Sequence, residues 1–127
     1  MLTKLTGHFQ GHLPQLIAFD LDGTLVDSVP DIAAATDRML VALGRPAAGE
    51  EQVRGWVGNG AALLVKRALA GSYDPAVVAT ISDAEFDPAM AAFREYYGEE
   101  NGRLTRLYGG VSDVLNAFHQ LRVPLAV

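Results

Sequence analysis

The sequence predicts an α/β fold, namely the start of a doubly wound parallel sheet with two strands present and an α-helical subdomain inserted between them. Two short apolar runs, at residues 16–19 and 123–127, are typical of strands buried in a parallel sheet. Residues 29–107 show helical periodicity instead, and that block is too long to be a loop. The domains expected are an N-terminal extension at 1–15, a partial α/β core at 16–28 and 108–127, and a helical subdomain at 29–107.

The composition excludes several classes of function. Half of the 127 residues are hydrophobic, which predicts a globular chain with a sizeable core. Ten Lys and Arg against fifteen Asp and Glu give a net charge of −5, so no broad basic surface is available for nucleic acid. The absence of cysteine rules out disulfides and fits a reducing cytoplasm. No signal peptide or membrane span is apparent, so we expect a cytoplasmic protein without a nucleic-acid or membrane partner.

The first fifteen residues are expected to form a solvated extension. His8 and His12 have the spacing of two metal ligands on one helical turn. Gly7 and Gly11 weaken the helix that this spacing requires, so the solvated extension is favoured over a metal site.

The residues after the first apolar run are candidates for the chemistry. Because strand side chains alternate, Asp20 and Asp22 can point to the same side, with Leu21 turned into packing. Two carboxylates this close repel unless a cation lies between them, and oxygen-only ligands favour Mg²⁺. Gly23 allows close approach of the backbone to a ligand, and Thr24 adds a hydroxyl, so the loop can present amides. An ordinary turn after a strand is the alternative interpretation.

The helical block begins with a capping pattern. Ser28 is placed to cap a helix, and Asp31 completes a capping box. Gly44 ends this helix. A shorter helix is expected at residues 50–57 and another at 61–70, ending at Gly71. The apolar stripe of the first helix is Ile32, Ala35, Met39 and Leu43.

A second candidate site is the loop Gly58-Asn59-Gly60. Glycine and asparagine supply positive φ angles, so a plain connector between two helices is one interpretation. The other is a substrate-facing loop at a helix N-terminus, where free amides and the helix dipole bind a carboxylate or phosphate.

The rest of the chain is expected to contain one long helix, a linker, a short helix and the second strand. Pro88 either kinks the long helix at residues 82–101 or begins it after Asp87. Residues 103–110 resemble a linker, and 111–121 form an amphipathic helix. The side chains expected in the core are Phe86, Met90, Phe93 and Tyr97 in the long helix and Val114, Leu115, Phe118 and Leu121 in the short one.

Two stretches carry a resemblance to a known family. The run from Asp20 to Ser28, which reads DLDGTLVDS, closely resembles the first motif of the haloacid dehalogenase-like hydrolases, in the branch that contains phosphoglycolate phosphatases. The stretch from Gly55 to Gly60, GWVGNG, resembles the cap of that branch. The resemblance extends over nearly the whole chain after residue 15, and it implies a Rossmann-like hydrolase core with an inserted helical cap.

The resemblance also implies a mechanism. It makes Asp20 the nucleophile and Asp22 the general acid/base, with Mg²⁺ held by Asp20 and by the backbone carbonyl of Asp22. Leu21, Asp22, Gly23 and Thr24 would bind the phosphate, and Gly58, Asn59 and Gly60 would form a substrate-specificity loop. The implied activity is magnesium-dependent hydrolysis of a small phosphorylated metabolite, 2-phosphoglycolate, to glycolate and phosphate through an aspartyl-phosphate. The family's dehalogenases lack the second acid, so Asp22 indicates phosphate chemistry.

One departure from the family limits this expectation. In similar enzymes the second strand ends in a Thr or Ser that binds phosphate, followed by a Lys and two further acids, whereas this sequence ends at Val127. We therefore expect negligible phosphatase activity from the 127 residues alone, and self-association through the incomplete core. One alternative is a truncated, non-catalytic remnant that binds metal, phosphate or a partner. Another is a phosphonate hydrolase or sugar phosphomutase, which can share the first motif.

Overall fold

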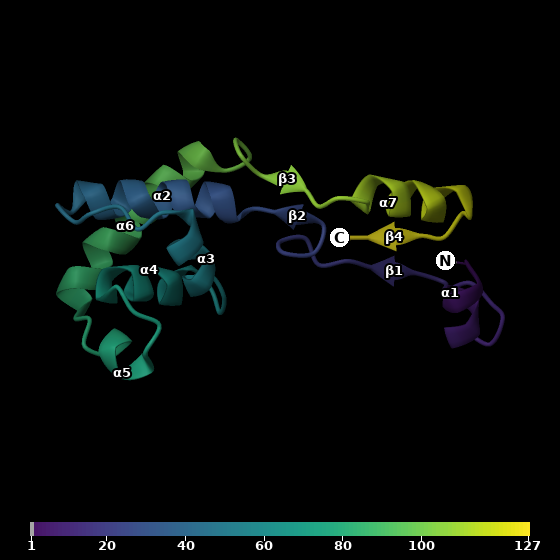
Figure 1. Cartoon of the computed structure of the whole chain (residues 1–127), viewed down its shortest axis with the longest axis horizontal. Helices are drawn as coiled ribbons and strands as arrows, with labels where there is room; N and C mark the ends of the chain where they lie inside the picture. The colour runs from purple at the N-terminus through teal and green to yellow at the C-terminus, as the bar shows by residue number, and fades with distance from the viewer. Residues whose placement is uncertain (1) are drawn as a thin grey trace. The chain divides into compact units, whose positions relative to one another are not determined.

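The computed structural model describes residues 2–127 and divides into two compact units (Figure 1). The first, here called the sheet unit, comprises Met1–Asp27 and Arg106–Val127. The second, the helical unit, is Ser28–Thr105. Within the described residues, none of the helices has both the length and the apolar character needed to cross a bilayer.

The sheet unit is built on a parallel pair of strands. Strand β1 (Ile17–Ala18) lies beside β4 (Leu125–Ala126), with Ile17 opposite Leu125 and Ala18 opposite Ala126 (Figure 1). Helix α7 (Val111–Gln120) comes directly before β4 and buries Phe118. Two parallel strands with a helix leading into the second were predicted from the sequence, and this arrangement is confirmed.

The predicted burial of these strands on both faces is wrong. Leu16 is 57% exposed and Val127 is 78% exposed. Among the described residues β1 pairs with β4 alone, so a two-stranded sheet leaves much of its apolar surface uncovered. An apolar run indicates a strand whose two faces need to be covered by other elements, but the strand is buried only where those elements are present.

A second pair of strands was not predicted. Strand β2 (Val26–Asp27) runs antiparallel to β3 (Arg106–Leu107), and the Tyr108 amide donates to the carbonyl of Leu25 at 3.1 Å. Strand β3 lies inside the stretch expected to be a linker. Two residues are too few to show a strand periodicity, so pairing with a distant segment is what defines this element.

The N-terminal segment contains a helix that the sequence did not lead us to expect. Helix α1 (Leu2–His8) includes seven of the residues assigned to a solvated extension, and within it Lys4, Gly7 and His8 are exposed. The helix ends at His8, and Gly11 has a φ of +85°. His12 therefore lies outside the helix, and the described residues contain no group of three potential metal ligands.

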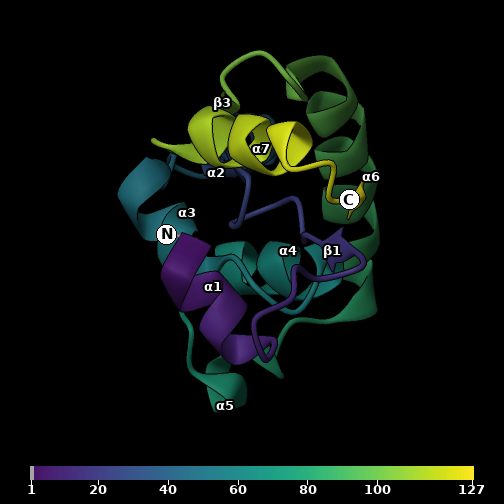
Figure 2. The same cartoon turned by 90° about the vertical axis from the view of Figure 1, so that its right-hand side faces the viewer.

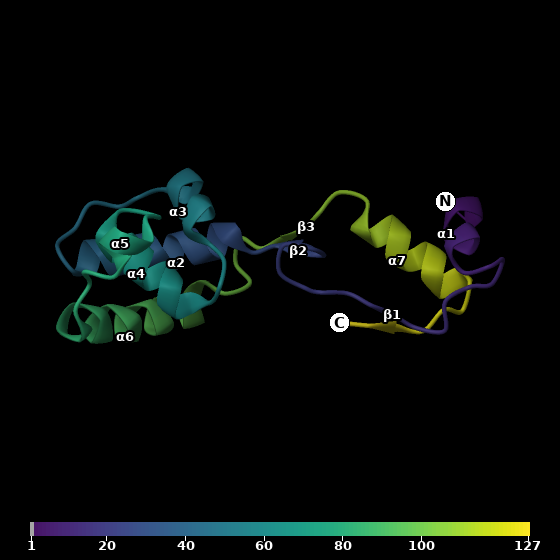
Figure 3. The ribbon, with the colours of Figure 1, turned by 90° about the horizontal axis from the view of Figure 1, so that it is seen from below.

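The helical unit packs five helices around one core. They are α2 (Val29–Ala42), α3 (Glu50–Trp56), α4 (Ala61–Ala70), α5 (Pro75–Val78) and α6 (Asp83–Glu100). Helices α2 and α6 pack against each other, and α4 lies beside α6 (Figure 2 and Figure 3). The buried core is Ala33, Ala35, Met39, Leu40, Val53, Trp56, Leu64, Val65, Ala68, Leu69, Ala89 and Phe93.

The apolar stripe predicted for α2 is confirmed in part. Ala35 and Met39 are fully buried, and Ile32 packs against the core. Leu43 is 37% exposed, and the buried residue of that turn is Leu40. Leu43 follows the last helical residue, so it no longer lies on the helical face that the spacing assumes.

The capping box predicted at the start of α2 is wrong. Ser28 has φ −95° and ψ −3°, and its side chain accepts no capping hydrogen bond. Asp31 is fully buried, and its carboxylate accepts hydrogen bonds from residues 102–105 instead. The Ser-x-x-Asp pattern alone does not determine which partner the aspartate takes.

A complete capping box occurs at α6, where it was not predicted. The Glu85 amide donates to the Ser82 hydroxyl oxygen at 3.3 Å, and the Ser82 amide donates to the Glu85 carboxylate at 3.1 Å. The hydrogen bond from that amide holds the pKa of the Glu85 carboxyl below its ordinary value. Helix α6 therefore starts at Asp83 and continues through Pro88, so the alternative start after Asp87 is wrong.

The aromatic stripe of α6 is confirmed as core. Phe93 is buried, and Phe86, Met90 and Tyr97 pack against the core. The rings of Phe93 and Tyr97 stack with their centroids 5.7 Å apart.

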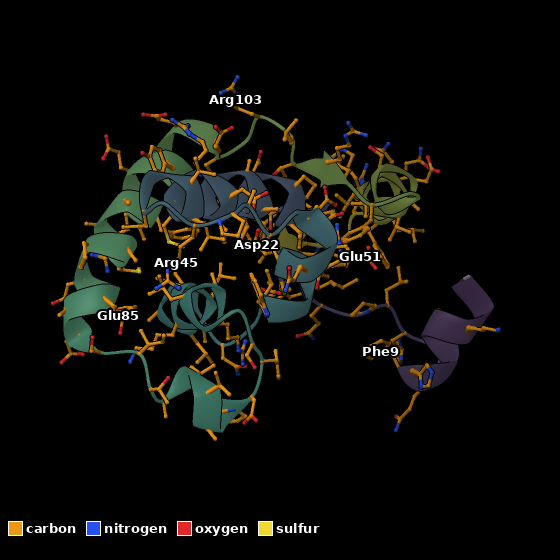
Figure 4. The ribbon with its side chains drawn as sticks, turned by 60° about the vertical axis from the view of Figure 1, so that its left-hand side comes forward. Phe9, Asp22, Arg45, Glu51, Glu85 and Arg103 are labelled. Atoms are coloured by element: carbon orange, nitrogen blue, oxygen red, sulfur yellow. The ribbon has the colours of Figure 1, made fainter. Side chains whose placement is uncertain are left out.

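Arg45, in the loop between α2 and α3, links two helices of this unit. Its guanidinium donates to the carbonyl of Leu69 near the end of α4 and lies 3.6 Å from the Glu85 carboxylate on α6 (Figure 4). A cation near the C-terminus of α4 also interacts favourably with the helix dipole.

Candidate active site

The two candidate carboxylates follow directly from the parallel strand pair. The Phe19 amide donates to the carbonyl of Ala126 at 2.9 Å, which continues the pairing one residue beyond β1. Asp20 is therefore at the carboxyl end of the sheet, and Figure 1 shows the C-terminus beside the loop that follows β1. This end of an open parallel sheet is where α/β folds bind ligands.

The loop after Asp20 is a tight turn centred on one carbonyl. The amides of Thr24, Leu25 and Val26 all donate to the Leu21 carbonyl, at 3.3, 2.9 and 3.1 Å. The Gly23 amide donates to the Val26 carbonyl at 2.9 Å, and Gly23 has a φ of +77°. That conformation favours glycine, which explains the glycine after the second aspartate.

The turn determines which backbone amides of the loop can donate a hydrogen bond to a phosphate. The amides of Gly23 and Thr24 already have acceptors inside the loop. The amides of Leu21 and Asp22 have no acceptor among the described residues. Among the four predicted phosphate-binding positions, the backbone amides left available to a ligand are therefore those of Leu21 and Asp22, while Thr24 also carries a hydroxyl.

Both carboxylates are exposed to solvent, and no described residue neutralises their charge. Asp20 and Asp22 are exposed, and neither makes a hydrogen bond or ion pair with a described residue. Leu21 is 45% exposed, so its predicted turn into packing is wrong.

These carboxylates fit a minimal magnesium site. Mg²⁺ in proteins often takes one or two carboxylates and completes its shell with water and substrate phosphate. Asp20 and Asp22 supply those oxygens, and no third His, Cys, Asp or Glu joins them among the described residues. Asp20 and Asp22 therefore fit part of the coordination shell of a magnesium ion.

A cavity lies next to the turn within the sheet unit. It has a volume of about 240 Å³, and Thr24 is its one side chain with a hydrogen-bonding group. An apolar lining is a poor site for a phosphate. The lining residues are Phe19, Thr24, Leu25, Gly109, Gly110, Val111, Val114 and Leu115.

In the helical unit, the Gly58-Asn59-Gly60 loop has the predicted backbone. The three residues have φ angles of +133°, +64° and +93°, and α4 starts directly afterwards. A Cβ added at Gly58 or Gly60 would meet nothing within 4 Å. The glycines are therefore required by their φ angles, and crowding plays no part in that requirement.

Arg67, on α4, is a residue that the sequence analysis missed. It is only 6% exposed, and it donates hydrogen bonds to the carbonyls of Trp56 and Gly58. The helical spacing in the sequence could have identified Arg67 as buried. It lies three positions after Leu64 and one before Ala68, on the buried face of the helix. An arginine on that stripe requires buried acceptors.

Asp31 was also assigned the wrong partner. Burial by itself raises the pKa of its carboxyl. The hydrogen bonds from the Thr105 hydroxyl and from the amides of Leu104, Gly102 and Thr105 outweigh burial and hold the pKa below its ordinary value. Asp31 thus connects the first turn of α2 to the last residues of the helical unit, and nothing in the local sequence indicates that contact.

Comparison with known proteins gives consistent results. The model of the haloacid dehalogenase-like hydrolase family matches residues 14–127. The chain is 54% identical over 119 residues to a phosphoglycolate phosphatase of Pseudomonas putida, and 52% identical over 119 residues to one of Pseudomonas fluorescens. Each match covers 94% of this chain and 42% of the relative, so the chain spans less than half the length of these relatives.

Solved structures show the same fold. The crystal structure of a predicted phosphoglycolate phosphatase from Haemophilus somnus is 38% identical and superposes with a TM-score of 0.72. That match covers 87% of this chain and 49% of the other. The motif at the carboxyl end of β1, the helical unit and the family match agree, and the chain belongs to the haloacid dehalogenase-like hydrolase family.

Proposed function

We propose that this chain carries the nucleophile and the general acid/base of a phosphatase that hydrolyses a small phosphate monoester, 2-phosphoglycolate. The observation that supports this most directly is the pair Asp20 and Asp22, exposed at the carboxyl end of β1 without a partner among the described residues. The relatives from Pseudomonas are named phosphoglycolate phosphatases, which supports the choice of substrate.

The first step is transfer of the phosphoryl group to the protein. A carboxylate oxygen of Asp20 attacks phosphorus in line, the bond from phosphorus to the ester oxygen breaks, and Asp22 gives its proton to the departing alkoxide. The amides of Leu21 and Asp22, which have no acceptor among the described residues, are proposed to donate to phosphoryl oxygens. The products of this step are glycolate and an aspartyl-phosphate at Asp20.

The second step regenerates the protein. Asp22, now deprotonated, takes a proton from water, the water oxygen attacks phosphorus, and the bond to Asp20 breaks to release phosphate. When bound, Mg²⁺ would neutralise charge between the Asp20 carboxylate and the phosphoryl group. The residues proposed to hold it are Asp20, through its carboxylate, and Asp22, through its backbone carbonyl.

Substrate choice is assigned to the loop Gly58-Asn59-Gly60. Its positive φ angles and its place at the N-terminus of α4 support this assignment, because the first amides of a ten-residue helix suit an anionic group. Phosphoglycolate differs from a generic aryl phosphate by its carboxylate. A loop that recognises the carboxylate would therefore favour phosphoglycolate over an aryl phosphate.

The experiment uses a chimera, because the chain covers 42% of its Pseudomonas putida relative. This chain replaces the matched segment of that relative, and turnover of 2-phosphoglycolate and p-nitrophenyl phosphate is measured with Mg²⁺ and with EDTA. We expect magnesium-dependent turnover of at least about 1 s⁻¹ on phosphoglycolate, an ordinary enzyme rate. A folded chimera that hydrolyses neither compound would refute the proposed function.

We also propose that the chain by itself associates through the sheet unit. Leu16, Leu107 and Val127 are 57%, 55% and 78% exposed, and the described residues include no second neighbour for β1. An unpaired strand edge with apolar flanks readily pairs with another chain. Self-association is the behaviour expected of a non-catalytic remnant, and the sizing experiment in the Discussion tests it.

A further inference from the structure

We propose that Arg67 is the positioning residue of the loop Gly58-Asn59-Gly60, and that it sets substrate preference by holding this loop between α3 and α4. The proposal rests on the proposed function, since it needs the loop to meet substrate. It adds a residue to which neither the motif nor the resemblance assigns a role.

The contacts of Arg67 join three segments. Its Nη1 donates to the carbonyl of Trp56 at 2.7 Å and to the carbonyl of Gly58 at 3.1 Å. Trp56 is the last residue of α3, and Gly58 is the first residue of the loop. One nitrogen on α4 therefore binds the end of α3 and the start of the loop together.

The loop has little else to hold it. All three of its residues are exposed, and a Cβ at either glycine would contact nothing. Val57, just before the loop, is 37% exposed and extended. Glycine-rich backbone is conformationally free unless other groups restrain it. The hydrogen bond from Arg67 to the Gly58 carbonyl therefore supplies a restraint that the loop residues do not provide themselves.

The charge of Arg67 explains why arginine occupies this position. Among the described residues no carboxylate pairs with Arg67, and its buried charge is met by two carbonyls and by the ring of Tyr73. The guanidinium carbon lies 4.0 Å from the centroid of that ring. A planar guanidinium can stack on the ring and donate in its own plane at the same time, whereas a lysine cannot do both.

The first measurement is amide hydrogen exchange in the chain itself. The reporters are the Val57 amide, which donates to Val53 at 3.0 Å, and the Leu64 amide, which donates to Gly60 at 3.2 Å. The reference is the Ile32 amide in α2, which donates to the carbonyl of Ser28 at 3.1 Å. In Arg67→Met we expect both reporters to exchange at least about tenfold faster relative to the reference, since two charge-assisted hydrogen bonds are lost.

Two further variants keep the result interpretable. Tyr73→Leu removes the exposed ring that stacks on the guanidinium without touching the core, and should accelerate the reporters about threefold. Lys66→Met is the matched control, because it removes a cation from the same helix. The Lys66 ammonium contacts the Phe86 ring and not the loop. If Arg67→Met and Tyr73→Leu both leave the ratio of reporter to reference unchanged, Arg67 does not hold the loop and the proposal is overturned.

The second measurement tests the effect on substrate choice in the chimera. We expect Arg67→Met to lower kcat/KM for 2-phosphoglycolate at least about tenfold more than for p-nitrophenyl phosphate, and Arg67→Lys to restore part of the preference. An unchanged ratio of the two kcat/KM values, with the loop loosened, would overturn the role in substrate choice. If the unsubstituted chimera is inactive, the proposed function fails, while the exchange result still decides whether Arg67 holds the loop.

Discussion

Asp31 and Thr105, which are 74 positions apart, are bonded at two points in the helical unit. The Thr105 amide donates to the Asp31 carboxylate at 3.1 Å, and the Thr105 hydroxyl donates to the same oxygen. The amides of Gly102 and Leu104 complete the set at 2.9 and 2.7 Å. The fully buried carboxylate therefore joins the beginning of the helical unit to its end.

The first prediction concerns the stability conferred by this carboxylate. Asp31→Asn keeps the volume but removes the charge and points an NH₂ group at donors, so the free energy of unfolding should fall by about 2–4 kcal/mol. Urea denaturation followed by the fluorescence of Trp56, the single tryptophan, measures the change. The exposed Asp87→Asn is the control and should shift stability by less than about 0.5 kcal/mol. Equal effects from the two substitutions would contradict the role of Asp31.

The second prediction gives the pH dependence of the same interaction. The pKa of Asp31 is lowered in the folded chain, so its contribution to stability is present above the unfolded pKa of about 3.9 and is lost as pH falls through the folded pKa. The difference in unfolding free energy between the unsubstituted chain and Asp31→Asn should be largest near neutral pH. It should shrink steadily below about pH 4. A difference that grows on acidification would show that the sign of the pKa shift is wrong.

The third prediction tests the nucleophile. Asp20→Asn in the chimera should reduce kcat on 2-phosphoglycolate to less than about one hundredth, because the amide cannot form the covalent intermediate. Asp20 is exposed and makes no contact with a described residue, so the melting temperature should be unchanged. Retention of most of the activity by a folded Asp20→Asn chimera would remove Asp20 from the role of nucleophile.

The fourth prediction separates backbone strain from crowding at the specificity loop. Gly60 has a φ of +93°, whereas Gly55 lies inside α3, and an added Cβ would meet open space at both positions. Gly60→Ala should destabilise the helical unit by about 1 kcal/mol, while Gly55→Ala should stabilise it by about 0.5–1 kcal/mol. Gly60→Ala should also impair the chimera more on 2-phosphoglycolate than on p-nitrophenyl phosphate. Stability changes of the same sign would mean that φ does not explain these glycines.

The fifth prediction concerns the 127-residue chain. With its exposed Leu16 and Val127, the purified chain should elute from a sizing column as an oligomer, and Leu16→Lys should shift it toward the monomer. Val77→Lys, which changes an exposed valine in the helical unit, is the control and should leave the elution unchanged. The same sample should show negligible phosphatase activity, because the chain spans 42% of the length of its Pseudomonas relatives and phosphoryl transfer depends on electrostatic stabilisation from more groups than two carboxylates. A monodisperse monomer that turns over phosphoglycolate at about 1 s⁻¹ would refute both expectations.

Much of the helical unit could be predicted because its signals are local. Helix α4 has the bounds expected from its composition, and Gly71 ends it in the left-handed conformation that glycine adopts at no steric cost. The aromatic stripe of α6 lies in the core because side chains three and four residues apart share one face of a helix. The Gly58-Asn59-Gly60 turn was predictable for the same reason, since its positive φ angles depend on the residues themselves.

The errors have a common physical cause. Ser28 and Asp31 have the spacing of a capping box, yet Asp31 binds backbone amides more than seventy positions away. Strand β3 exists through its pairing with β2, and Leu21 is exposed because nothing in the sheet unit covers it. In each case the outcome depends on a segment remote in sequence, which a local pattern does not specify.

The sequence by itself determined the carboxylate pair at the end of an apolar strand, the family to which the chain belongs and the positions of its main helices, because each is encoded in neighbouring residues. Only the tertiary structure decided which amides of the Asp20 loop are available to a ligand, where the Asp31 carboxylate is satisfied and that Arg67 reaches the Gly58 carbonyl. Those features depend on hydrogen bonds between groups that folding brings together, and a buried polar group takes whichever partner the packed chain places within reach.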